Sequence, residues 1–138
     1  RDVYTIIIMN AAAKEQFVKV WNTNLKKFLT DLQYTFPNEK IFKQAMAGIP
    51  ALLITDKTKI VRNFYKYASR YESYVTEKNE EFFLSCDFSD EQDDADGSHL
   101  IAIIGRLRAL WIGMTPQNRE SMWKWIGNLY QMSKIICA

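Results

Sequence analysis

The residues that could do chemistry in this chain are few, and their spacing matches no familiar catalytic arrangement. His99 is the only histidine, which argues against zinc or iron sites built on histidine ligands. Its neighbour Ser98 is better explained as a helix N-cap than as a nucleophile. The five glycines are isolated from one another, so there is no phosphate-binding loop. We therefore expect no catalytic residues, no metal and no cofactor.

The strongest charge feature is an acidic connector over residues 86–97. Residues 79–97 hold eight acidic residues and no basic ones. A calcium loop with its glycine at Gly97 would need a bidentate carboxylate at position 103, where the sequence has Ile103. A solvated loop is therefore the favoured interpretation, and its carboxylates could attract a basic partner. The carboxylates that could make this contact belong to Asp90, Glu91, Asp93, Asp94 and Asp96.

Basic residues are spread over the two flanking regions. Residues 1–78 hold thirteen Lys or Arg against seven acids, and residues 98–138 hold five against one. This excess is mild for a dedicated nucleic-acid binder, which carries a dense basic stripe. The tightest basic groups are Lys26-Lys27, Arg106 and Arg108, for which a solvated helix face is favoured over weak contact with a nucleic-acid backbone.

The cysteines and the apolar runs of the sequence indicate the redox compartment and whether the chain spans a membrane. Cys86 and Cys137 match no metal or redox spacing, and two thiols are favoured over one disulfide between the connector and the C-terminal end. No apolar run reaches the ~18 residues of a membrane span. Residues 1–9 are expected to form an extended arm or a non-native extension, because Asp2 disfavours a signal peptide.

Glycine and proline are scarce, which predicts an all-α fold. A first helix should begin after Asn10 as its N-cap and end at Pro37. Its apolar residues recur every three or four positions and should face the core. They are Phe17, Trp21, Leu25, Phe28, Leu32 and Phe36.

The rest of the chain predicts further helices separated by identifiable breaks. A short second helix should span residues 38–47, because Gly48 and Pro50 read as its stop. A third should run from Thr55 or Asp56 to about Lys78. The segment beginning with Asn79 should form one capped turn.

After the connector, a fourth helix should begin at Ser98 and end near Trp111. A fifth should begin with Thr115 as its cap and Pro116 in its first turn. The prediction is one domain over residues 10–138, a single bundle of four to five helices with the acidic loop between the third and fourth main helices.

Aromatic residues make up 14% of the chain, and they broaden the apolar faces of the third and fifth helices. Tryptophan and tyrosine are frequent anchors of protein interfaces. An aromatic-rich core accounts for them equally well, and the sequence leaves these alternatives open. The candidate partner-binding aromatics are Trp111, Trp123, Trp125, Tyr65 and Tyr74.

The order of segments over residues 17–134 resembles small all-helical proteins of unassigned activity encoded by nucleocytoplasmic large DNA viruses. The motifs that carry the resemblance are Asp31-Leu32…Phe36-Pro37, Phe64-Tyr65-x-Tyr67, Lys78-Asn79-Glu80-Glu81-Phe82-Phe83-Leu84, Asp87-Phe88-Ser89-Asp90 and Met122-Trp123-Lys124-Trp125-Ile126…Leu129-Tyr130-x-Met132-Ser133.

The resemblance implies a non-enzymatic viral structural protein, such as a minor capsid or virion component, with other viral structural proteins or itself as partners. Its expected location is the virion or the cytoplasm of the infected host cell. Two alternatives stay open. One is an intracellular adaptor or regulator that binds a basic partner through the acidic loop, and the other is weak nucleic-acid binding.

Overall fold

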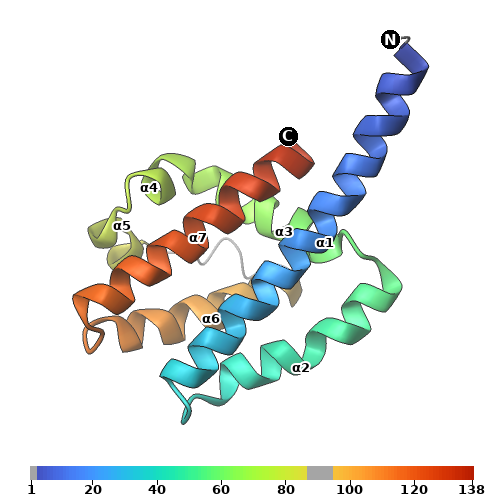
Figure 1. Cartoon of the computed structure of the whole chain (residues 1–138). Helices are drawn as coiled ribbons and strands as arrows, with labels where there is room; N and C mark the ends of the chain where they lie inside the picture. The colour runs from blue at the N-terminus through green and yellow to red at the C-terminus, as the bar shows by residue number, and fades with distance from the viewer. Residues whose placement is uncertain (1–2, 87–94) are drawn as a thin grey trace.

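The computed structural model describes the backbone of residues 3–86 and 95–138, and the side chains of residues 10–86 and 102–138 (Figure 1). Within these ranges the chain is helical and contains no strand, so the all-α prediction is confirmed. The elements in chain order are α1 (Val3–Thr35), α2 (Lys40–Thr55), α3 (Lys59–Ala68), the 3-10 turn η1 (Ser69–Tyr71), α4 (Glu72–Thr76), α5 (Glu80–Ser85), α6 (Ala95–Trp111) and α7 (Pro116–Cys137).

The long helix α1 packs against α2 on one side and α7 on the other. Its buried residues Trp21, Leu29 and Leu32 follow the predicted apolar stripe. Phe28 stacks on Trp125 of α7 with ring centroids 5.6 Å apart. Asn22, also buried, donates a 3.1 Å hydrogen bond to the carbonyl of Lys57 and so ties α1 to the turn before α3.

The start of α1 differs from the prediction. Residues 3–10 are helical, so Asn10 lies inside the helix and is not its N-cap. The stretch contains neither proline nor glycine, and the alanines at 11–13 favour propagation of a helix in both directions. The first turns of α1 project beyond the other helices in Figure 1 rather than forming an extended arm.

Helix α2 passes through its two predicted stop residues. Gly48 and Pro50 both lie within it, and Glu39 rather than Asn38 occupies the N-cap position. A proline inside a helix removes one backbone hydrogen bond. Ile49 is buried beside it and Leu53 packs against the core one turn later, so burial of apolar side chains outweighs that loss.

The predicted third helix is broken into α3, η1 and α4. Helix α3 begins at Lys59 with Thr58 at its N-cap position, so the predicted start at Thr55 or Asp56 is wrong. Asp56 lies at the C-cap of α2, and its Oδ1 accepts hydrogen bonds of 2.9 Å from both the amide and the hydroxyl of Thr58. At the end of α4, Lys78 adopts a left-handed backbone with φ of 52°. The amide of Asn79 then bonds to the Tyr74 carbonyl and that of Lys78 to the Val75 carbonyl, which is a Schellman ending.

The capped turn at Asn79 is confirmed as α5, because the Asn79 Oδ1 accepts from the Phe82 amide at 2.9 Å. The predicted cap at Ser98 is wrong, since α6 already begins at Ala95 and includes the last residues assigned to the connector. Thr115 does cap α7, its hydroxyl accepting from the Asn118 amide at 3.1 Å. Cys86 and Cys137 are thiols rather than a disulfide.

Candidate binding sites

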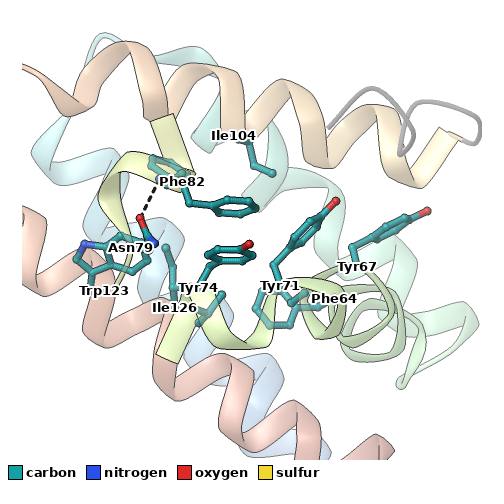
Figure 2. A pocket seen from close by; sticks show the side chains of 12 residues that line it. Phe64, Tyr67, Tyr71, Tyr74, Asn79, Phe82, Ile104, Trp123 and Ile126 are labelled. Atoms are coloured by element: carbon teal, nitrogen blue, oxygen red, sulfur yellow. Dashed lines mark hydrogen bonds between the residues drawn. The ribbon is translucent and has the colours of Figure 1, made fainter. Parts of the chain in front are cut away.

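A pocket of about 150 Å³ lies between the α3–α5 segment and helices α6 and α7 (Figure 2). Its lining is almost entirely aromatic and aliphatic. The lining residues are Phe64, Tyr67, Ala68, Tyr71, Tyr74, Val75, Asn79, Phe82, Phe83, Ile104, Trp123 and Ile126.

Helical spacing and one tight turn build the aromatic side of the pocket. Tyr67, Tyr71 and Tyr74 are four and three residues apart on α3, η1 and α4, and all three line the pocket. The Schellman ending at Lys78 then reverses the chain, and Phe82 stacks on Tyr74 with ring centroids 3.6 Å apart and planes 4° from parallel. Figure 2 shows these rings close together, with Ile104 above them from α6.

The inner end of the pocket is fixed by a second aromatic cluster. Phe83 contacts both Trp111 and Trp123 with ring centroids 5.3 Å and 6.1 Å away. The indole N–H of Trp111 donates to Glu80 Oε1 at 2.7 Å, and Arg119 Nη1 lies 3.3 Å from the same oxygen. The indole N–H of Trp111 therefore has its hydrogen-bond partner at the edge of the cluster, and the pocket itself stays apolar.

The pocket offers no charged group for catalysis or for neutralising a charged ligand. None of its described lining residues is a carboxylate, histidine, lysine or arginine. The amide oxygen of Asn79 is engaged as a helix cap. Just outside the lining, Lys66 and Arg70 lie over the ring of Tyr67, 5.2 Å and 5.6 Å from its centroid. The pocket can therefore hold a neutral apolar group.

A second candidate surface runs along the outer side of α1. Phe17 is 40% exposed and Val20 37% exposed, although the sequence pattern assigned Phe17 to the core. With the exposed Ala13 they form a line that we call the outer stripe, roughly 90° around the helix from Trp21, Leu25 and Leu32. In the sequence, Met9 and Ile6 repeat the same spacing towards the start of α1.

Helix α7 packs against α1, and the first turns of α1 project past the end of α7 (Figure 1). Burial raises the pKa of the Cys137 thiol, while the positive charges of Lys14 and Arg62 act in the opposite direction.

The structure separates the predicted partner-binding aromatics. Trp111 is 1% exposed and Trp123 9% exposed, so they cannot serve as surface anchors in this fold and belong to the core. The half-buried Tyr65 stacks on Tyr130, 6.2 Å between centroids, and Trp125 stacks on Phe28. Tyr74, 38% exposed, lies at the rim of the pocket.

The charged candidate residues also lie in different parts of the chain. Asp90, Glu91, Asp93 and Asp94 lie outside the described residues, and Asp96 falls within helix α6 rather than in a loop. Arg106 makes two hydrogen bonds to the Glu39 carboxylate, at 3.0 Å and 2.5 Å. Arg108 donates to the carbonyls of Phe83 and Cys86. Through these contacts the two arginines hold α2 and α5 to α6.

Neither the outer stripe nor the pocket was predicted from the sequence. The 3–4 spacing of Val20, Phe17, Ala13 and Met9 was visible but was obscured by the stronger stripe on the same helix. The contact between Tyr74 and Phe82 depends on the backbone at Lys78, which no residue type signalled.

Among the described residues, no group of three or more His, Cys, Asp or Glu could hold a metal ion. No described helix is both long and apolar enough to cross a membrane. Comparison of the chain with protein-family models, curated proteins and solved structures finds no match.

Proposed function

We propose that this protein is a non-enzymatic structural protein that acts through protein–protein contacts along the outer stripe of α1. In this proposal its partners are a second copy of the chain or neighbouring structural proteins. The more specific role, a minor capsid or virion component, rests on the resemblance to helical proteins of large DNA viruses. The location in the virion or the infected cell rests on the same resemblance.

The observation that carries the proposal is the projection of α1 past the end of α7 (Figure 1). An isolated helix of this length is marginal in water, because most helical stability in proteins comes from packing of an apolar face. Residues 3–9 read Val-Tyr-Thr-Ile-Ile-Ile-Met, a largely apolar run. A helix of this composition is stabilised when a partner covers it.

The outer stripe supplies the point where such a partner would meet the domain. Phe17 and Val20 lie one turn apart at the base of the projection, and both keep more than a third of their surface exposed. A 3–4 spacing of apolar residues over several turns is the pattern by which helices pair. The absence of charged side chains from the described lining of the pocket supports a binding role over catalysis.

Self-association is the first test. Sedimentation equilibrium of the wild-type chain from about 1 to 100 µM should show a reversible dimer or higher oligomer. The double variant Phe17→Glu/Val20→Glu should remain monomeric with unchanged helicity. Tyr34→Glu is the matched control, because Tyr34 is an exposed aromatic on the same helix, roughly 21 Å further along its axis than Val20.

The virion role is tested by composition. Quantitative mass spectrometry of gradient-purified particles, compared with infected-cell lysate, should show the protein enriched at a fixed ratio to the capsid protein. A strictly monomeric protein that is absent from particles would contradict the proposal as a whole. A self-associating protein absent from particles would keep the contact surface and reject the virion role.

A further inference from the structure

We propose that the aromatic pocket is a binding site for a small neutral molecule, an unsubstituted or alkyl-substituted single aromatic ring. The pocket is separate from the outer stripe of α1, so this inference is independent of the assembly role proposed above.

The size of the pocket fixes the size of the ligand. A volume of about 150 Å³ leaves room for one benzene-sized ring, the guest that an enclosed apolar cavity of about this volume has been found to take up. Larger drug-like molecules need pockets of roughly 300 Å³ or more. The aliphatic part of the lining comes from Ala68, Val75, Ile104 and Ile126.

The lining fixes the chemistry of the ligand. Tyr71, Tyr74 and Phe82 offer ring edges and faces for stacked or edge-to-face contacts, which favour an aromatic guest over an aliphatic one. A carboxylate would enter without a charged partner among the described lining residues. An ammonium group would likewise find no carboxylate among the described lining residues.

The surroundings of the pocket distinguish a small molecule from a side chain of a partner protein. A protein anchor needs an apolar surface around its pocket, because the centres of protein interfaces are depleted of charged residues. The exposed residues next to the lining on α3–α5 are mostly charged: Lys66, Arg70, Glu77, Lys78 and Glu81. A ligand that enters the pocket completely meets no such obstacle.

Methyl NMR of the full chain tests the site directly. Ala68, Val75, Ile104 and Ile126 all place methyl groups in the lining, so binding should shift their ¹H–¹³C signals together. Toluene should give saturable shifts with a Kd of roughly 1 mM or tighter. Benzoate and benzylammonium, which have the same ring with a charge, should bind at least about tenfold more weakly.

Two variants make the test specific. Ala68→Leu puts a larger side chain into the pocket and should weaken toluene binding at least about tenfold. Ala109→Leu, at an exposed position on α6, is the matched control and should bind as the wild type does. If Ala68→Leu does not fold, Ile104→Ala enlarges the same pocket and should shift the preference from toluene to naphthalene.

The proposal is overturned by any of three results. The first is no saturable shift of the lining methyls with toluene at up to about 10 mM. The second is equal binding by the wild type and Ala68→Leu, which would place the ligand elsewhere. The third is equal affinity of the wild-type pocket for toluene and for the charged probes benzoate and benzylammonium.

Discussion

The indole N–H of Trp21 on α1 donates a 2.9 Å hydrogen bond to the main-chain carbonyl of Leu129 on α7. Trp21 is completely buried, and its ring also meets Phe64 of α3 edge to face at 5.4 Å. One side chain therefore sets the position of α1 relative to two other helices. The contact links segments 108 residues apart in the chain.

Replacement of Trp21 tests that role. Trp21→Phe removes the hydrogen bond and leaves unfilled volume in the core, and we expect it to lower the free energy of unfolding by about 2 kcal/mol. Urea denaturation followed by circular dichroism measures this change. Trp125→Phe, at a half-buried site on α7, should cost less than about 1 kcal/mol. Equal losses for the two variants would show that Trp21 holds no special position.

Glu80 is expected to matter more than the adjacent Glu81. Glu80 accepts from Trp111 and pairs with Arg119, whereas Glu81 is exposed, and both lie in the first turn of α5. Glu80→Ala should therefore destabilise the protein by about 1 kcal/mol more than Glu81→Ala, since both lose the same interaction with the helix dipole. Thermal unfolding compares them. Identical melting temperatures would mean that the cluster around Trp111 does not need the carboxylate.

Lys78 is expected to tolerate glycine. Its φ of 52° costs a residue with a Cβ more than it costs glycine, and glycine is preferred at this position of a Schellman ending. The substitution also removes the exposed ion pair with Glu120, which contributes little. Lys78→Gly should therefore raise stability by about 0.5 kcal/mol in denaturant titration. Lys78→Ala keeps the strain while losing the ion pair and should not stabilise the protein.

Alkaline pH should destabilise the protein partly through Tyr130. Burial, helped by the Glu72 carboxylate, raises the pKa of Tyr130 from 10.0 to about 12. The unfolded chain therefore loses this proton first. The stabilisation is complete below pH 10, falls as the pH rises towards 12, and its loss amounts to no more than about 3 kcal/mol.

Tyr130→Phe isolates this contribution. It cannot ionise, so its unfolding free energy should fall less steeply than that of the wild type between pH 10 and pH 12. Lys134, whose pKa is raised by its hydrogen bond to Glu72, titrates in both proteins and contributes in the same direction. Parallel pH profiles for the two proteins would show that Tyr130 ionises normally in the fold.

The helical fold was predictable because strong local signals coincide with packing. Asn79 and Thr115 cap helices as expected, since the side-chain oxygen needed for a cap is a property of the residue itself. Gly48 and Pro50 misled the prediction, because burial of Ile49 overrides a local break and depends on partners distant in sequence. Ser98 failed as a cap for a related reason, since a capping residue can also occupy a helix interior.

The candidate sites were less predictable than the fold. Trp111 and Trp123 could be assigned equally to core or surface from sequence, and only the positions of α5 and α6 decide for the core. The pocket needs the unexpected left-handed residue at Lys78 to bring Tyr74 onto Phe82. A pattern along one helix cannot report a cavity formed by five segments.

The position of Cys137 near the end of α7 allows its chemical labelling to report the binding of a partner to α1. Only a thiolate reacts with iodoacetamide, and burial keeps the Cys137 thiol protonated and partly covered. Alkylation at this residue should therefore be slower than at a fully exposed thiol. A partner on α1 that also covered the end of α7 would slow it further, so the labelling rate of one native side chain would report occupancy without any added tag.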